Sequence, residues 1–284
     1  MSSSARSSLV WSGPTEELSS AAFERFRRLI YDNSGIVLAE NKRPLVRARI
    51  QKRMRALSLV EYDEYLSRIM ADRTGTELQH LLDAISTNVT SFYRERHHFD
   101  FMGPTIISWL NQGLTRLRIW SAACSTGEEP YTIGMEVLEA LGGRSIDVKI
   151  LATDIAAQVL RECQRGEYPA ARVEPVPSIM RNKYFTKSGD RHHATYSVTQ
   201  DLRRLVFVRQ FNLIKFPYAV TGPMDFIYCR NVMIYFDRDT RCEIVKEFGR
   251  IIRPGGYLFV GHAESLTGLE SGFTAVRPSI YKRV

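Results

Sequence analysis

The sequence of 284 residues lacks any apolar run long enough to cross a membrane. Its longest apolar runs, residues 224–229 and 256–260, have the length of single strands, whereas a membrane-spanning helix needs roughly 20 apolar residues. It also lacks a secretory leader, because the Ser-rich residues 1–20 contain no basic segment followed by an apolar one. We therefore predict a globular protein without membrane insertion, which begins with a flexible tail over residues 1–20.

Cysteine is scarce, and its spacing excludes two further kinds of site. The four cysteines include no CxxC pair, so neither a zinc site nor a disulfide framework is predicted. The adjacent histidines at residues 97–98 and 192–193 should point apart on a helix or strand, which makes them poor metal ligands. We predict no metal and a reducing, cytoplasmic location. The cysteines are Cys124, Cys163, Cys229 and Cys242.

Residues 21–82 have the apolar spacing of short helices and predict a small helical domain. One of these helices, over residues 41–57, has an apolar stripe and carries Pro44 in its first turn. Its other faces are basic with no acidic residue between, which is typical of a solvated surface or of a docking face for an acidic partner. The net charge of +8 favours an acidic partner but does not choose among nucleic acid, a membrane surface and protein. The basic residues of this helix are Lys42, Arg43, Arg47, Arg49, Lys52, Arg53 and Arg55.

Strands alternate with helices over residues 116–284, which predicts an α/β domain with a mostly parallel sheet. A final antiparallel pair over residues 273–276 and 279–282 makes the predicted sheet mixed. Residues 168–203 interrupt the alternation with three prolines and a turn, so we predict an inserted antiparallel β subdomain there. Residues 83–115 are predicted to be a linker segment that contributes to the cofactor site. The other predicted strands are 116–121, 148–152, 205–211, 224–229 and 257–260, and the predicted helices are 128–141, 155–165 and 238–252.

The loop after the first predicted strand, residues 122–129, lacks the GxGxxG pattern of dinucleotide-binding loops. Its small residues let the backbone approach a ligand, yet Glu128 and Glu129 at the next helix start would repel a pyrophosphate. This combination favours a positively charged cofactor without phosphate, such as S-adenosylmethionine. Asp154 follows the second strand, where a carboxylate can accept hydrogen bonds from ribose hydroxyls or cap the next helix.

Four strings of residues carry a resemblance to a known family. They resemble, in the right order, the motifs of the chemotaxis receptor methyltransferases of the CheR type, which are Rossmann-like S-adenosylmethionine-dependent enzymes. The resemblance extends from about Phe23 to the C-terminus and implies a methyltransferase domain preceded by a small helical domain and interrupted by a β subdomain. The strings are TNVTSFYRE at residues 87–95, WSAACSTGEEPY at 120–131, TDI at 153–155 and CRNVMIYF at 229–236.

The resemblance implies which residues contact the cofactor and its product, S-adenosylhomocysteine. Glu129 would attract the amino group of the methionine moiety, Asp154 the ribose, and Asn212 with Leu213 the adenine. A structural salt bridge is the alternative role for Arg230. The implied contacts are Asn88, Thr90, Arg94, Glu129, Asp154, Asn212, Leu213, Arg230 and Asn231.

The segment after the fourth strand, residues 230–233, indicates the kind of acceptor. It lacks the [DN]-Pro-Pro-aromatic string of enzymes that methylate base amino groups, and Tyr228 rather than proline precedes Cys229. An anionic acceptor fits better, because a glutamate carboxylate is ionised near neutral pH and needs no general base. Arg94 and Tyr235 are the candidate catalytic residues that would hold this carboxylate, and core packing is the alternative role for Tyr235.

The resemblance implies methylation of glutamate side chains on chemotaxis receptors, for sensory adaptation, with no nucleic-acid partner. The basic helix at residues 41–57 would bind the acidic methylation segments, and a receptor C-terminal peptide could dock on the inserted subdomain at residues 187–194. Relatives that dock such a peptide have more glycine there than the single Gly189. Two alternatives stay open: an RNA methyltransferase, which the basic helix favours and residues 230–233 do not, and a noncatalytic S-adenosylmethionine-binding adaptor.

Overall fold

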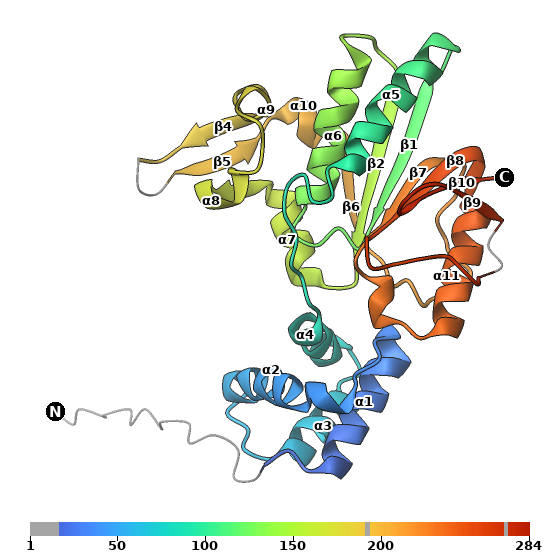
Figure 1. Ribbon diagram of the computed structural model, residues 1–284. Helices are drawn as coiled ribbons and strands as arrows, with labels where there is room; N and C mark the ends of the chain where they lie inside the picture. Colours follow the sequence, from blue (N-terminus) through green and yellow to red (C-terminus); the bar gives the residue numbers. More distant parts are fainter. Residues whose placement is uncertain (1–16, 191–193, 270–271) are drawn as a thin grey trace. The chain divides into compact units, whose positions relative to one another are not determined.

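The computed structural model describes residues 17–190, 194–269 and 272–284. The chain divides after Ser86 into two compact units, both drawn in Figure 1. Most of the predicted tail, residues 1–16, lies outside the described residues. No helix in the described part of the chain is both long enough and apolar enough to span a bilayer.

The first unit is helical, which confirms the predicted helical domain. Its first helix begins where the side chain of Ser19 accepts a hydrogen bond from the backbone of Ala22 at 3.1 Å. It ends at Gly35, whose φ of 71° favours glycine. Phe26 and Tyr65 pack in the core with ring centroids 6.0 Å apart. The elements are α1 (Ser20–Ser34), η1 (Glu40–Lys42), α2 (Arg43–Ala56), α3 (Tyr62–Ala71) and α4 (Thr76–Ile85).

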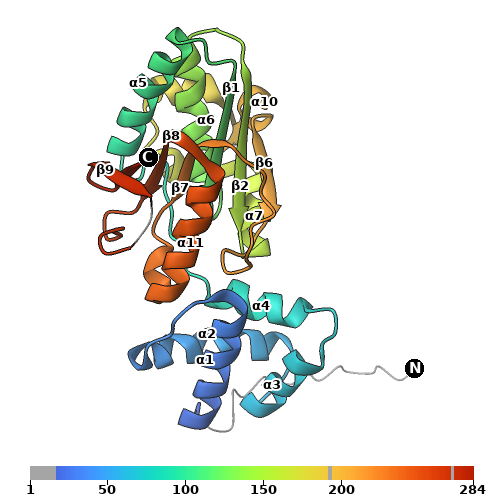
Figure 2. The same cartoon turned by 90° about the vertical axis from the view of Figure 1, so that its right-hand side faces the viewer.

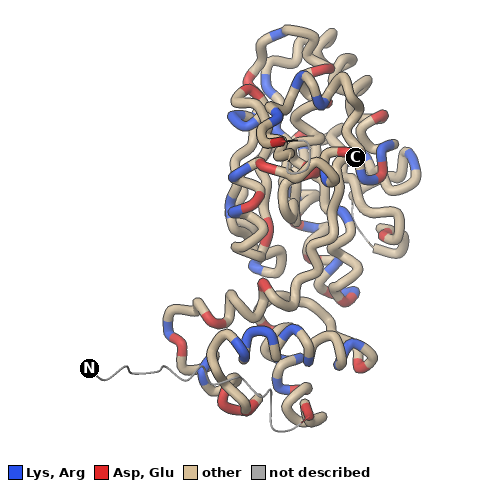
Figure 3. Tube along the Cα trace, turned by 90° about the vertical axis from the view of Figure 1, so that its left-hand side faces the viewer, with Lys and Arg blue, Asp and Glu red and all other residues tan. Residues whose placement is uncertain are grey.

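The basic helix α2 has more carboxylate partners than its sequence indicates. Arg53 makes two hydrogen bonds of 2.7 Å to Glu77 of α4, and Tyr65 donates to the same carboxylate at 3.0 Å. Arg47 pairs with Glu17 at 3.0 Å. The sequence of the helix contains no acidic residue, and these partners come from distant points of the chain. Figure 3 marks the basic residues in blue. The exposed basic residues of α2 and η1 are Lys42, Lys52 and Arg55.

The second unit is built on a seven-stranded sheet. Five strands run parallel, and the last two form an antiparallel pair at one edge. This arrangement confirms the predicted mixed, mostly parallel sheet. From edge to edge the strands are β6 (Val206–Gln210), β2 (Asp147–Asp154), β1 (Arg116–Ala122), β7 (Met224–Cys229), β8 (Ile252–Val260), β10 (Ile280–Arg283) and β9 (Phe273–Arg277).

Helices cover both faces of this sheet, with α5 and α6 on one face and α11 on the other (Figure 2). Trp120 of β1 packs edge-on against Phe248 of α11, with ring centroids 5.5 Å apart. The neighbouring Ile119 points the other way and belongs to a buried cluster with Phe99 and Met102 of α5. The central strand β1 is thus buried on both sides, as strands inside a parallel sheet are. The helices are α5 (His97–Asn111), which falls within the predicted linker segment, α6 (Glu128–Leu141), α7 (Ala157–Arg165) and α11 (Arg238–Ile251).

The topology places the loop after β1 where parallel sheets bind ligands. β1 lies between β2 and β7, so the order of the strands reverses beside it. Ala122 at the end of β1 aligns with Thr153 of β2 and with Cys229 of β7. The carboxyl ends of these three strands therefore meet at one edge, at the switch point where open α/β sheets hold their ligands.

The predicted insertion is confirmed as a separate three-stranded antiparallel sheet, in the order β3-β5-β4. Three short helices accompany these strands, which the sequence did not indicate. Residues 191–193 of the predicted docking loop lie outside the described residues. The elements are β3 (Glu167–Pro169), α8 (Ala170–Val173), α9 (Ser178–Tyr184), β4 (Phe185–Ser188), β5 (Thr195–Val198) and α10 (Gln200–Arg203).

Several element boundaries differ from the prediction, and two of the differences have a clear physical cause. The strand expected over residues 257–260 begins at Ile252, so the Pro-Gly-Gly string at residues 254–256 lies inside β8. A register shift against β7 near the start of this strand accommodates the proline, which has no N–H to donate. The helix expected from residue 155 begins at Ala157, because the carboxylate of Asp154 accepts the backbone N–H two residues on and holds the chain in a turn.

Candidate active site

The loops at the carboxyl edge of the sheet have unusual backbone conformations. Seven described residues other than glycine have a positive φ, and five of them lie in these loops. Such conformations persist where the surrounding contacts hold them, and they cluster at functional sites. The five are Tyr93 (55°), Glu95 (54°), Ala123 (71°), Ser125 (50°) and Asn231 (59°).

Gly127 in the loop after β1 cannot be replaced without displacing its neighbours. Its φ is 101°, and a Cβ at this position would lie 2.7 Å from both Sγ of Cys163 and the hydroxyl of Tyr168. The backbone of Cys124 also donates to Thr153 at 2.8 Å, which fixes the start of the loop against β2. The small residues predicted to bring this backbone close to a ligand are thus also required by close packing behind the loop.

Asp154 anchors the same loop from the end of β2. One carboxylate oxygen accepts the N–H of Ser125 at 2.9 Å, and the other accepts the N–H of Ala156 at 3.0 Å. The residue is only 7% exposed. The helix-cap role considered from the sequence is replaced by a turn: the N-cap of α7 is Ala156, and Asp154 binds the backbone N–H of that residue. A carboxylate can accept further hydrogen bonds from a ligand.

Glu129 on the first turn of α6 is a buried carboxylate with two protein donors. The hydroxyl of Ser121 donates to it at 2.6 Å, and Nη1 of Arg230 lies 3.1 Å from its other oxygen. Burial raises the pKa of Glu129, while Arg230 and Ser121 oppose that shift. An additional cationic donor near this carboxylate would stabilise its ionised form.

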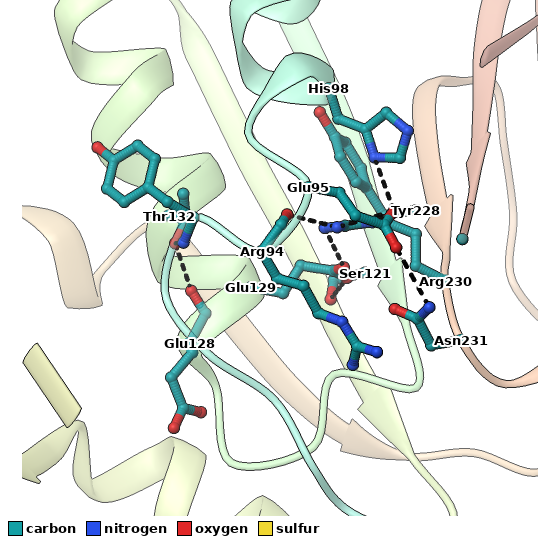
Figure 4. Close-up of polar contacts among 12 residues, drawn as sticks. Arg94, Glu95, His98, Ser121, Glu128, Glu129, Thr132, Tyr228, Arg230 and Asn231 are labelled. Carbon is teal, nitrogen blue, oxygen red and sulfur yellow. Dashed lines mark hydrogen bonds and ion pairs between the residues drawn. The ribbon is translucent and has the colours of Figure 1, made fainter. Parts of the chain in front are cut away.

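Arg230 makes the structural salt bridge that was its alternative role. Its Nε donates to Glu95 at 3.3 Å, Nη1 pairs with Glu129, and Nη2 donates to the backbone carbonyl of Arg94. The side chain is only 2% exposed. All three guanidinium nitrogens are thus used within the protein, in the row of dashed contacts drawn in Figure 4.

Glu95 is the residue that joins these loops, and it was not among the predicted site residues. Besides Arg230, its carboxylate accepts from the side-chain amide of Asn231 at 3.3 Å and from the backbone N–H of His262 at 3.2 Å. Burial alone would raise the pKa of Glu95, but Arg230 and these donors lower it. The residue ends the string at residues 87–95, and that position was the only signal of it in the sequence.

Glu264 holds the acceptor segment from the opposite side and was also missed. This buried carboxylate accepts the N–H of Asn231 at 2.8 Å, of Gly261 at 2.5 Å and of Ile234 at 3.3 Å. It therefore fixes residues 231–235 to the loop after β8. Nothing in the sequence distinguished it from the other acidic residues of that loop.

The prediction that His97 and His98 point apart was wrong. Their ring centroids are 4.1 Å apart, and both Nε2 atoms reach the hydroxyl of Ser279, at 3.2 and 2.8 Å. The single proton of that hydroxyl is donated to the carbonyl of Pro278. Its oxygen therefore accepts a hydrogen bond from each of the two imidazoles. The two side chains converge because the turn between β9 and β10 presents one acceptor at the start of α5. No group of three metal-ligating side chains occurs among the described residues.

Arg94 and Tyr235 keep polar groups that the rest of the described chain does not use. The guanidinium of Arg94 donates to the backbone carbonyl of Val89 at 2.9 Å and has no carboxylate partner among the described residues. Tyr235 ends the turn η2 (Met233–Tyr235) and is half-buried, and its hydroxyl has no hydrogen-bond partner within the described ranges. Both groups are therefore open to a ligand.

The remaining predicted residues lie on the same edge. The backbone carbonyl of Asn88 accepts from the hydroxyl of Ser125 at 3.0 Å, which joins the string at residues 87–95 to the loop after β1. Asn212 accepts from the backbone of Ile214 at 3.2 Å. Leu213 is buried and Thr90 is half-buried. The structure thus brings together the four strings that were far apart in the sequence.

The composition of this edge suits a cofactor that is cationic and rich in donors. Its carboxylates Glu129, with a side chain 12% exposed, and Asp154, 7% exposed, can accept from amino and hydroxyl groups. A pyrophosphate would be repelled by the same carboxylates. The residues present therefore fit S-adenosylmethionine.

Comparisons with known proteins agree with this chemistry. The family model described as "CheR methyltransferase, all-alpha domain" matches residues 21–86, and the one described as "CheR methyltransferase, SAM binding domain" matches residues 88–281. A chemotaxis protein methyltransferase of Salmonella typhimurium is 38% identical over 264 residues, which cover 93% of this chain and 90% of the relative.

Two further relatives are similar over the same extent. Chemotaxis protein methyltransferase 2 of Pseudomonas aeruginosa is 38% identical over 262 residues, 91% of each chain. The chemotaxis protein methyltransferase of Borreliella burgdorferi is 35% identical over 266 residues, 91% of this chain and 93% of the relative. The similarity covers both units of the chain.

Proposed function

The chain belongs to the CheR family of chemotaxis methyltransferases and binds S-adenosylmethionine, and from this premise we propose that it methylates glutamate side chains of chemotaxis receptors. The products would be a glutamate methyl ester on the receptor and S-adenosylhomocysteine. We further propose that the reaction takes place in the cytoplasm.

The observation that carries the proposal is that, within the described residues, Arg94 has no carboxylate partner and the hydroxyl of Tyr235 has no hydrogen-bond partner. A guanidinium without a carboxylate partner among the described residues suits an anionic acceptor. The nearby Arg230, by contrast, has all three nitrogens paired within the protein. Arg94 is therefore the cation that we assign to the incoming glutamate, and the hydroxyl of Tyr235 would donate to the same carboxylate.

In the proposed reaction, the main task of the protein is to position the acceptor carboxylate against the methyl group. When bound, S-adenosylmethionine supplies an electrophilic methyl group on a sulfonium. The acceptor carboxylate is already ionised near neutral pH, so no side chain has to remove a proton. Arg94 would hold the carboxylate in line with the methyl group, and proximity of this kind is worth roughly 7 to 11 kcal/mol of a barrier. The neutral transition state favours a site from which water is excluded.

We propose that Glu129 accepts from the amino group of the cofactor and Asp154 from its ribose, while Asn212 and Leu213 contact the adenine. Asn88, Thr90 and Asn231 complete the contacts. Arg230 is proposed to act on the cofactor through Glu129, since it orients that carboxylate and uses its own donors within the protein.

The receptor is proposed to dock through the exposed basic residues of the first unit. Lys42, Lys52 and Arg55 extend into solvent and complement an acidic methylation segment. A receptor C-terminal peptide is proposed to add to the exposed edge strand β4 of the inserted sheet, by the pairing that peptides make with open strand edges.

Transfer of a labelled methyl group tests the proposal and its alternatives. The purified protein should transfer label from S-adenosylmethionine to a receptor cytoplasmic fragment, as an ester that alkali releases. Alkali-stable label on RNA would favour the RNA methyltransferase, and cofactor binding without any transfer would favour the adaptor. Either result would contradict glutamate methylation.

Arg94→Ala should lower kcat/KM by roughly 100-fold or more, since losing the charged hydrogen bond that binds and positions the acceptor carboxylate costs about 3 kcal/mol. Arg96→Ala is the matched control, because Arg96 is exposed two residues away and pairs only weakly with Asp100 at 3.7 Å. Unchanged melting temperatures for both variants would exclude misfolding. Equal kcat/KM values for the two variants would remove Arg94 from the mechanism.

A further inference from the structure

A small cavity lies beside the acceptor segment, between η2 and the loop that follows β8. Its volume is about 20 Å³, which is room for one oxygen-sized group. Met233, Ile234 and Leu266 give it apolar walls, and Arg241 and Glu264 are its charged lining residues. The cavity therefore shares the turn η2 with Tyr235, which we assign to the acceptor carboxylate.

Arg241 is an unpaired cation in this cavity. Its Nε is buried and has no hydrogen-bond partner, and no described residue forms an ion pair with its guanidinium. The other arginines of α11 are satisfied: Arg238 donates to the carbonyl of Gly268 at 3.1 Å, and Arg250 pairs with Glu247 at 2.7 Å. A buried charged donor without a partner is costly, so an anion at this point would be stabilised.

Glu264 does not serve as that anion. Its two oxygens already accept three backbone N–H groups, from Asn231, Gly261 and Ile234, and it forms no ion pair with Arg241 within the described ranges. The first turn of α11, which carries Arg241, adds the positive end of a helix dipole to the charge of the guanidinium. The same turn also carries Asp239, and Glu264 lines the cavity, so the group that an external carboxylate oxygen would bind is the unpartnered Nε of Arg241 itself.

We propose that Arg241 binds a second acidic side chain of the substrate. Its carboxylate would lie on the same helix face as the glutamate that receives the methyl group, three or four residues away along the substrate chain. Two carboxylates three or four residues apart on one helix face lie about 5 to 6 Å apart at their Cβ atoms, a spacing that lets neighbouring pockets read both. Tyr235 and Ile234 are adjacent on η2, and Ile234 is 50% exposed at the cavity. Arg241 is thereby a specificity-determining residue, which selects acidic segments over isolated glutamates. This inference rests on the proposed function.

A double-mutant cycle tests the assignment. Receptor fragments are prepared with one acceptor glutamate and with every other acidic residue within four positions either kept or changed to its amide. Arg241→Gln should lower kcat/KM by roughly 10- to 100-fold on the acidic fragment, and should match the unchanged protein on the neutral fragment. Arg241→Lys, which keeps the charge, should recover part of the loss.

Arg238→Gln is the matched control, since it removes a cation one turn earlier on the same helix and should give similar values on both fragments. An equal loss for Arg241→Gln on both fragments would show a merely structural role and overturn the proposal, as would no loss on either. Binding of S-adenosylmethionine, measured in parallel, should not change. If the unchanged protein forms no ester on any fragment, glutamate methylation itself fails, and the role of Arg241 fails with it.

Discussion

At the scale of single residues, the site depends on one buried cation between two carboxylates. Arg230 lies between Glu95 and Glu129, and each partner comes from a different loop. Removing either carboxylate would leave the buried guanidinium with one carboxylate partner in place of two, and the loss of part of its compensation is costly. The triad is therefore best understood as the device that fixes three loops in one arrangement around the cofactor.

His98 lies against this triad and makes stability depend on pH. Burial, reinforced by the charge of Arg230, lowers the pKa of His98 from its ordinary 6.5 to about 2. The folded protein thus keeps this imidazole neutral, while the unfolded chain takes up a proton below pH 6.5. The free energy of unfolding should fall as pH falls below 6.5, by at most about 1.4 kcal/mol per pH unit from this group, and should not depend on it above pH 7.

His98→Gln tests that dependence, because the amide can still donate to Ser279. Urea unfolding followed by the fluorescence of Trp109 and Trp120 reports on the second unit. The unchanged protein should exceed the variant by a constant amount above pH 7, and the difference should shrink between pH 6.5 and 4.5. The buried Glu129 has a raised pKa and an opposite effect, but it is common to both proteins and cancels. Parallel stability curves over this range would refute the assignment.

The site residues that could not be predicted from the sequence are those whose partners lie far away along the chain. The strings contained Arg230 and Glu95, but their contact joins positions 135 residues apart. Glu264 lies outside the four strings. Its partners are backbone N–H groups, which are present whatever the sequence, so no residue type indicates the contact. By contrast, the loop that contains Gly127 was predicted, because small residues at the end of a strand commonly let the backbone approach a ligand. The cofactor contacts stay predictions until a ligand is bound.

At the scale of elements, the basic residues of α2 lie on two sides of the helix. Arg53 faces Glu77 and Tyr65 within its own unit, whereas Lys52, the preceding residue, extends into solvent. The periodicity of the sequence predicted the helix and its buried stripe. It did not indicate which of the seven basic residues pair with carboxylates and which are exposed. Only the packing of α2 against α4 divides them into a structural and an exposed set.

Substitutions on α2 should separate these sets. Arg53→Gln should lower the free energy of unfolding of the first unit by about 3 kcal/mol, because Glu77 would be left nearly buried without its cation. Lys52→Gln should change stability by less than about 0.5 kcal/mol and instead raise KM for the receptor. Chemical denaturation and methylation kinetics on both variants make the comparison. A stability loss at Lys52, or none at Arg53, would contradict the division.

Elements with a regular alternation were predicted well, and the irregular ones were not. The parallel strands and the final antiparallel pair follow from apolar runs and turn residues. The Pro-Gly-Gly string at residues 254–256 misled the prediction, because proline usually ends a strand and here is tolerated by a register shift. The short helices α8, α9 and α10 have too few residues for a periodic signal.

At the scale of the whole molecule, the net positive charge and the carboxylates of the site are proposed to attract different ligands. The net charge of +8 and the exposed basic residues act over distances comparable with the Debye length and favour an acidic partner, which we propose to be the receptor surface. The carboxylates that we propose for the cofactor, Glu129 and Asp154, are largely shielded from bulk salt and would act at short range. One protein thus combines long-range attraction for its acceptor with short-range selection of its donor.

This separation predicts that salt will affect the two substrates differently. Raising the ionic strength from about 0.05 to 0.5 M shortens the Debye length severalfold, so KM for the receptor fragment should rise by roughly tenfold. The Kd for S-adenosylmethionine should change by less than about twofold, because its contacts are buried and short. Kinetics and calorimetry over one salt series make the measurement. Lys52→Gln combined with Arg55→Gln should flatten the salt dependence of KM and leave the Kd unchanged. A KM that ignores salt would mean that the receptor is held by apolar contacts, and that the basic face of the first unit is a solvated surface.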